Sequence, residues 1–172
     1  MVRKILPALA HEYFFGPLEM HDTTFFPHDV ERTAPTEVSE DGAVIQGIVH
    51  DESARVFARA HRAVGHAGLF STASDLLTFL GALLRGAYPS VVNDAQRGLG
   101  WQVDQHWFGN YAGKRAFGKT GFTGTSVVCD MEQGIAFTIL SNRTYPHRPS
   151  DATSPQSAIN VFRSDLSDIL FR

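Results

Sequence analysis

Two long stretches of the chain carry apolar residues at the spacing of an α-helix. Residues 2–15 carry an apolar stripe that predicts a helix. A helix there can contain Pro7 only if this proline lies in the first turn. Residues 73–85 follow Thr72-Ala73-Ser74-Asp75, which has the sequence of a capping box. Apolar residues point almost all round this second helix, so we expect it to be buried. They are Leu76, Leu77, Phe79, Leu80, Leu83 and Leu84.

A third helical pattern closes the chain. Thr153-Ser154-Pro155 places a proline where a helix tolerates it best, in the first turn. One apolar face follows, and we expect it to lie on a sheet. Its residues are Ala158, Ile159, Phe162, Leu166, Ile169 and Leu170.

Between these helices the pattern changes to short strands. Strands are predicted at 99–103, 115–121, 125–130 and 135–142, with a turn at 131–134 in which Gly134 supplies a positive φ. Residues 51–62 predict a short helix, and residues 21–49 show no persistent period. The expected fold is α+β: an antiparallel β-sheet meander with the C-terminal helix packed on it and a partial helical lobe. A length of 172 residues fits a single domain, 1–172.

Charge, apolar run length and cysteine count argue against several kinds of partner and site. A net charge of −3 favours neither nucleic acid nor an anionic membrane as partner, although Lys114 and Arg115 lie near Trp101, Trp107 and Tyr111. No apolar run reaches the length of a membrane span, and the apolar part of residues 1–10 is too short for a signal peptide. The single Cys129 lies in an apolar strand, so we expect a buried side chain and no disulfide or cysteine-based metal site.

The candidate chemistry centres on residues 117–126, Phe-Gly-Lys-Thr-Gly-Phe-Thr-Gly-Thr-Ser. Glycines let a ligand approach the backbone, and a lysine and hydroxyl groups can bind a carboxylate or an oxyanion. A glycine-rich hairpin arm with a solvated lysine would have the same sequence.

Four passages resemble the class C β-lactamase-like, penicillin-binding serine hydrolases. Residues 16–23, Gly-Pro-Leu-Glu-Met-His-Asp-Thr, are similar to the family's "PLGM-x-DT" passage, with Glu19 in place of a glycine. Residues 65–76 are similar to "G-GLFSTA-DL". Lys119-Thr120-Gly121 matches the third catalytic motif. Residues 140–146 resemble the strand end that follows it in the family. These passages stand in the family's order and extend over nearly the whole chain.

The resemblance implies roles for six residues. Lys119 is the catalytic candidate, which supplies positive charge to the substrate carboxylate and the nucleophile. Thr120 binds that carboxylate, Gly121 lets substrate lie along the strand, and the N–H of Phe122 is an oxyanion-hole donor. Asn142 and Arg143 stand where family members contact the carboxylate, although a strand-end cap and a solvated cation are the favoured explanation of the two. His66 is a candidate cleft residue or a structural histidine.

Two of the family's catalytic motifs are absent. The nucleophile belongs to Ser-x-x-Lys, but Met1, Tyr111 and Ala116 precede the three lysines by three residues. No asparagine follows a tyrosine or serine in the Tyr-x-Asn or Ser-x-Asn pattern. The chain therefore resembles the C-terminal, substrate-recognising half of an enzyme that transfers acyl groups of a β-lactam, a D-Ala-D-Ala peptide or an ester. We expect little activity from the chain alone, with Ser71 and Ser126 as the alternative nucleophiles.

Other interpretations stay open beside this one. A non-catalytic binding or assembly module, or a truncated relic, would retain the same passages. A metal site could be assembled from His50, Asp51, Glu52, His61 and His66, but a helix that starts at Asp51 fits the spacing better, and neither a metal nor another cofactor is expected. For partners, we expect a homodimer or a separate N-terminal fragment, because the apolar helix and the sheet edge need cover.

Overall fold

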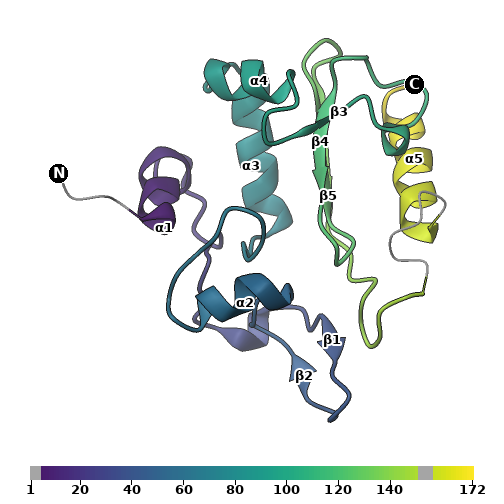
Figure 1. Cartoon of the computed structure of the whole chain (residues 1–172). Helices are drawn as coiled ribbons and strands as arrows, with labels where there is room; N and C mark the ends of the chain where they lie inside the picture. The colour runs from purple at the N-terminus through teal and green to yellow at the C-terminus, as the bar shows by residue number, and fades with distance from the viewer. Residues whose placement is uncertain (1–4, 151–156) are drawn as a thin grey trace. The chain divides into compact units, whose positions relative to one another are not determined.

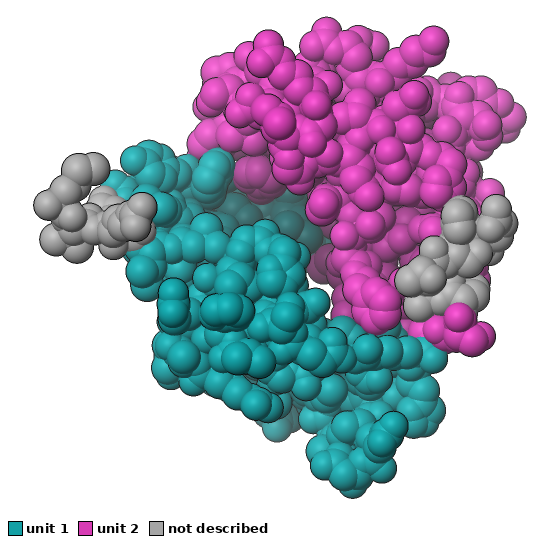
Figure 2. All heavy atoms as spheres, viewed as in Figure 1, with its two compact units in different colours: residues 1–78, 144–148 teal, residues 79–143, 149–172 magenta. Residues whose placement is uncertain are grey.

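The computed structural model describes residues 5–150 and 157–172. The chain divides into two compact units, residues 1–78 with 144–148 and residues 79–143 with 149–172 (Figure 2). That residues 1–172 form a single domain stays a prediction. None of the described helices is long and apolar enough to cross a membrane.

The first unit is built from short helices and one small hairpin (Figure 1). Its elements are α1 (Leu6–Ala10), a π-helical turn (His11–Phe15), a 3-10 turn (Val30–Arg32), β1 (Glu37–Val38), β2 (Val44–Ile45) and α2 (Glu52–Ala58). Asp51 caps α2, because its side chain accepts from the N–H of Ala54 at 2.7 Å. The prediction of a helix that starts at Asp51 is confirmed.

Two expectations for this unit need correction. The stripe in 2–15 forms five α-helical residues followed by a π-turn, with Pro7 in the first turn as expected, and residues 1–4 lie outside the described part. The stretch 21–49 is also more ordered than its sequence predicts. Glu37 pairs with Ile45 and Val38 with Val44, and the carboxylate of Asp41 accepts from Ser39 Oγ and Ala43 N to close the turn.

Helix α3 (Ala73–Leu84) starts in the first unit and ends in the second, close to the predicted 73–85. The second unit continues with α4 (Pro89–Ala95), β3 (Gln102–Val103), a 3-10 turn η3 (His106–Phe108), β4 (Phe117–Thr120), β5 (Ser126–Asp130), β6 (Ile135–Ile139) and α5 (Ala158–Leu170). The four strands form an antiparallel sheet in the order β3-β4-β5-β6. The predicted meander, its turn with Gly134 at φ 68°, and the α+β class are confirmed.

Side chains on the two faces of this sheet enter separate cores. Phe117 and Cys129, which are register partners, pack with Leu80 and Leu83 of α3 and with α4. On the other face Val128, Phe137 and Ile139 pack with η3 and with Phe171 at the end of α5. The sheet is therefore covered by α3 and α4 on one side and by η3 and α5 on the other (Figure 1).

Helix α5 contacts the sheet through a different side from the one predicted. Phe162 and Ile169, expected on the sheet, are 52% and 72% exposed, whereas Arg163 and Ser167 are 3% and 0% exposed. Leu166 is only partly buried against the core. The apolar pattern identified the helix correctly, but the outward orientation of its apolar side is a correction. The predicted start at 153–155 falls outside the described residues.

Candidate functional site

The Lys-Thr-Gly passage lies at the end of strand β4. Lys119 pairs with Val127 and Thr120 with Ser126 on the neighbouring strand β5. Lys119 lies on the same face as Phe117 because the two are separated by one residue. Phe117 is fully buried but Lys119 is exposed, and Thr120 is partly exposed. Among the described residues, neither side chain has a hydrogen-bond or ion-pair partner.

Glycine at 118 brings this strand down onto two aromatic rings. A Cβ atom there would lie 2.8 Å from Phe108 Cε1 and 2.8 Å from Trp107 Cη2, and would also crowd the carbonyl oxygen of Val127. Both rings come from η3 and belong to the core under the sheet. Gly118 therefore lets the strand that carries Lys119 lie in direct contact with these two rings.

A tight turn follows the strand. The N–H of Gly121 donates to Thr125 O at 2.8 Å, and the N–H of Gly124 donates to Gly121 O at 3.0 Å. Gly124 has φ 110°, a conformation that side chains with a Cβ rarely adopt. Ser141 Oγ donates to the carbonyl of Gly124 at 2.9 Å. The backbone after Thr120 is thereby held in one shape.

Arg143, in the segment after β6, donates hydrogen bonds to the same turn. Its N–H donates to Thr123 O at 2.9 Å, and its Nε donates to Phe122 O at 2.9 Å. The guanidinium also lies 5.5 Å from the ring centroid of Phe122, which is 44% exposed. Asn142 precedes it and is partly buried. All six predicted site residues are therefore in the second unit, near the Lys-Thr-Gly strand end or the segment that contacts its turn.

Arg163 was missed from the sequence, because nothing in the pattern of α5 marks it. Its Nη2 donates to Thr125 O at 2.8 Å and its Nη1 to Asn160 Oδ1 at 2.8 Å. The guanidinium lies 5.8 Å from the ring centroid of Trp107. Burial, and secondarily the charge of Arg143, lowers the pKa of Arg163 to about 10. Two arginines thus hold the turn and place positive charge beside it.

Two of the passages that resemble the family, residues 16–23 and 65–76, contact each other in the first unit. The buried carboxylate of Asp75 accepts from Asp22 N at 2.9 Å and from Thr23 Oγ1 at 2.7 Å, while Thr23 Oγ1 also lies 2.7 Å from Ser71 Oγ. The N–H of Asp75 donates to Thr72 Oγ1 at 3.3 Å, which is half of the predicted capping box. The Asp75 carboxylate accepts hydrogen bonds from residues 22 and 23, so it joins these passages across the chain.

The alternative nucleophiles are poorly placed for attack. Ser126 is 3% exposed and its face of the sheet lies toward η3 and α5. The hydroxyl of Ser71 is engaged in a hydrogen bond with Thr23.

Burial, with the nearby charge of Asp130, raises the pKa of the Cys129 thiol to about 12. Cys129 is thus a core residue, as predicted.

His66 belongs to the cap of α2 in the first unit. Its Nε2 lies 3.1 Å from Ser53 Oγ and 3.3 Å from Asp51 Oδ1. The bonds that the Asp51 carboxylate accepts from Ala54 N–H and Ser53 Oγ lower its pKa to about 2. These contacts give His66 a structural role at the helix start. Within 5–150 and 157–172, no group of three or more His, Cys, Asp and Glu residues is arranged to hold a metal ion.

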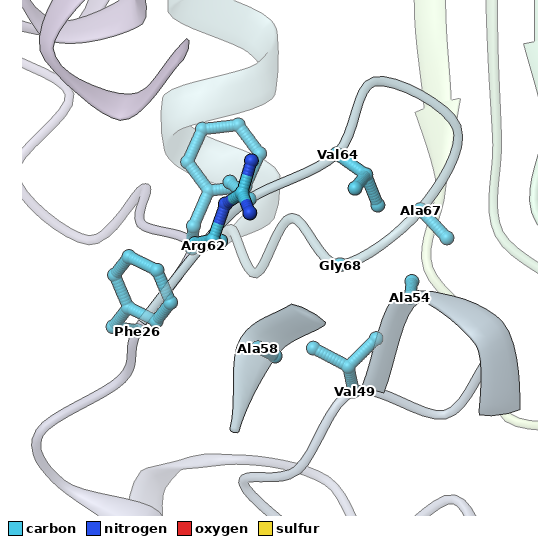
Figure 3. A pocket seen from close by; sticks show the side chains of 10 residues that line it. Phe26, Val49, Ala54, Ala58, Arg62, Val64, Ala67 and Gly68 are labelled. Carbon is cyan, nitrogen blue, oxygen red and sulfur yellow. The ribbon is translucent and has the colours of Figure 1, made fainter. Parts of the chain in front are cut away.

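A small cavity in the first unit is also unsuited to a substrate (Figure 3). Its volume is about 10 Å³, close to the minimum for one water molecule. Apolar side chains such as Phe26, Val49 and Ala58 line it, so a water there would find few partners. The cavity is a packing defect between α2 and the neighbouring loops.

Comparison with known proteins agrees with these passages. The beta-lactamase family model matches residues 6–159. A protein described as "Putative D-alanyl-D-alanine carboxypeptidase" from Escherichia coli (strain K12) is 30% identical over 92% of the chain and 44% of its own length. An "N-acetylmuramyl-L-alanine amidase" from Bacillus subtilis (strain 168) is 32% identical over 94% of the chain and 44% of its own length.

A solved structure, a beta-lactamase from Mycobacterium bovis, shares the fold at a TM-score of 0.59. It is 19% identical, and the match covers 95% of this chain and 54% of that one. The chain thus spans less than half the length of the two curated relatives. With the match to the family model along most of the sequence, these similarities establish that the chain belongs to the beta-lactamase family of serine hydrolase-like proteins.

Proposed function

We propose that this chain is the substrate-recognising part of a beta-lactamase-like serine hydrolase, and that Lys119 and Thr120 bind the carboxylate of the acyl donor. The observation that carries the proposal is that the exposed ammonium of Lys119 and the partly exposed hydroxyl of Thr120, at successive positions of the strand end, both lack side-chain partners among the described residues. An ammonium and a hydroxyl on a fixed strand are suitable donors for a carboxylate. The turn held by Arg143 and Arg163 supplies the fixed strand end.

The name of a relative supports the choice of substrate class. The Escherichia coli protein carries the name of a carboxypeptidase for D-alanyl-D-alanine, whose peptide ends in a free carboxylate. We therefore propose a D-Ala-D-Ala peptide as the first ligand to test, with β-lactams and esters as further acyl donors. Gly121 would let the peptide backbone lie beside the strand, and the N–H of Phe122 would face the reacting carbonyl oxygen.

Acyl transfer also needs a nucleophile and a base, and the chain encodes neither Ser-x-x-Lys nor Tyr-x-Asn. We therefore expect the chain alone to show hydrolysis of nitrocefin and p-nitrophenyl acetate close to the uncatalysed rate. Turnover that persists in a Lys119→Ala variant would contradict a Lys119-centred site. Turnover that Lys119→Ala abolishes would instead point to a nucleophile within the chain, with Ser71 the first to replace.

A titration with N-acetyl-D-alanyl-D-alanine, followed by amide NMR, tests recognition directly. The largest shifts are expected at Lys119, Thr120 and Gly121, and Lys119→Ala should weaken binding by about tenfold, as expected for loss of one charged hydrogen bond. Lys114→Ala is the matched control, because Lys114 is also exposed but lies before the strand. Shifts that are absent, or unchanged in Lys119→Ala, would favour a non-catalytic assembly module over this proposal.

A further inference from the structure

Arg163 is a charged side chain buried in the second unit without an acidic partner. It is 3% exposed. Among the described residues its hydrogen-bond partners are the carbonyl of Thr125 and the amide oxygen of Asn160, so no carboxylate balances the charge. Burial of such a charge is unfavourable, and an apolar side chain of similar length would occupy the place at less cost. Stability alone therefore does not explain an arginine here.

Other polar atoms at the same interface also lack partners. Arg163 Nε and the hydroxyls of Ser126, Ser157 and Ser167 are buried and form no hydrogen bond among the described residues. Buried polar groups are normally paired, and exceptions to such packing rules occur mainly at functional sites. These groups and the buried charge indicate that this side of α5 has a function besides holding the sheet.

The hydrogen bonds of Arg163 lead to the turn after the Lys-Thr-Gly passage. The carbonyl of Thr125 accepts from Arg163 Nη2 at 2.8 Å and from the N–H of Gly121 at 2.8 Å. The N–H of Gly124 donates to Gly121 O at 3.0 Å. Because Gly121 O and the N–H of Phe122 belong to one planar peptide unit, this second bond also fixes the direction of the Phe122 N–H.

We propose that Arg163 is a positioning residue for acyl transfer: through the carbonyl of Thr125 it holds the turn in the shape that directs the N–H of Phe122 toward the reacting carbonyl oxygen. This inference rests on the proposed function, in which that N–H is an oxyanion-hole donor. Such a donor is effective only when it is held in place before the reaction. A planar guanidinium suits this task, because it donates to Thr125 and Asn160 at once while it lies 5.8 Å from the ring centroid of Trp107.

The first measurement is amide hydrogen exchange of the ligand-free chain. Arg163→Met keeps a flexible side chain beside Trp107 but removes the donors, and Arg163→Lys can still donate to Thr125. The Gly121 N–H should exchange at least about tenfold faster in Arg163→Met than in the wild type, as expected for loss of one charged hydrogen bond, with Arg163→Lys between the two.

Two further variants serve as controls. Arg172→Met is the matched one, because Arg172 also lies over a ring, 5.2 Å from the centroid of Tyr111, and donates to Tyr111 Oη at 3.1 Å, but is exposed. Phe171→Leu weakens the packing of the α5 end against Phe137 without a change in the turn. Each should alter the Gly121 exchange rate by less than about twofold.

The second measurement is a titration with N-acetyl-D-alanyl-D-alanine. The amide signals of Lys119 and Phe122 should both shift in the wild type. In Arg163→Met the affinity should fall by about threefold to tenfold, as expected for loss of one hydrogen bond to the peptide carbonyl, and the Phe122 shift should be lost while the Lys119 shift remains. Arg163→Lys should restore part of both, and Phe171→Leu should change neither.

An unchanged Gly121 exchange rate in Arg163→Met, or an equal effect of Phe171→Leu, would overturn the proposal. A urea melt checks that Arg163→Met is folded; if it is not, a wild-type rate in Arg163→Lys would overturn the proposal instead. Faster Gly121 exchange in a chain whose wild type binds no peptide would support the hold on the turn and refute the proposed function. Peptide binding that depends on Lys119 but not on Arg163 would do the reverse.

Discussion

Replacement of Asp75 by alanine should destabilise the first unit strongly. The carboxylate accepts from the N–H of Asp22 and the hydroxyl of Thr23, and it is 9% exposed. Hydrogen bonds to a charged group contribute about 1.5–3 kcal/mol each, and donors left buried without an acceptor add to the cost. Thr23 retains Ser71 as a partner, so we expect a net loss of about 3–4 kcal/mol, a large part of the ~5–15 kcal/mol typical of a domain.

Urea unfolding followed by circular dichroism measures this loss as a lower midpoint with an unchanged slope. Asp94→Ala is the control, because Asp94 is exposed and should change stability by less than about 0.5 kcal/mol. A double-mutant cycle with Thr23→Val should give a coupling energy above about 0.5 kcal/mol, because the two side chains touch. An Asp75→Ala loss below about 1 kcal/mol, or no coupling to Thr23, would refute the idea that this carboxylate joins the two passages.

Three further predictions concern other parts of the chain. Gly118→Ala should destabilise the second unit by about 1–3 kcal/mol in urea unfolding, because its Cβ would overlap Phe108 and Trp107; a neutral result would contradict the packing described. Asp51→Ala should cost about 1 kcal/mol at pH 7. Its folded pKa is depressed from 3.8 to about 2, so the Asp51 contribution is present above about pH 4 and lost toward pH 2; urea midpoints of wild type and variant should converge there, and a constant gap would argue against the cap. Cys129 should resist Ellman's reagent at pH 8 until the protein is denatured, since burial raises its pKa to about 12, and fast labelling of folded protein would show that it is accessible.

The sequence predicted the order of the helices and strands better than it predicted which side of each one packs against the rest of the chain. The strands around residue 119 followed from short apolar runs and from glycines at turns, and the structure confirms them. Helix α4 went unnoticed although Pro89 at its start is a recognisable signal, because its seven residues contain too few turns to show a period. Helix α5 has a clear apolar stripe that lies outside, with Arg163 inside. An apolar stripe therefore identified the helix, but it did not identify the side of the helix that packs against the rest of the chain.

The site was predicted through its motif more than through its periodicity. Lys119 and Thr120 could be named because Lys-Thr-Gly has a mechanism attached to it. The contacts of Arg143 and Arg163 with the turn could not, because they join residues separated by 21 and 38 positions, and the Arg163 contact also depends on how α5 is rotated. The joining of residues 22–23 to Asp75 was likewise hidden, although both passages had been recognised.

The central claim, that Lys119 recognises a substrate carboxylate, is tested most directly by two ligands that differ only in that group. Calorimetry or NMR titration gives the affinity of N-acetyl-D-alanyl-D-alanine and of its C-terminal amide for the wild type, Lys119→Ala and Lys114→Ala. The wild type and Lys114→Ala should prefer the acid by about tenfold, and Lys119→Ala should bind both ligands equally weakly. A Lys119→Ala variant that keeps the preference for the acid would contradict the claim.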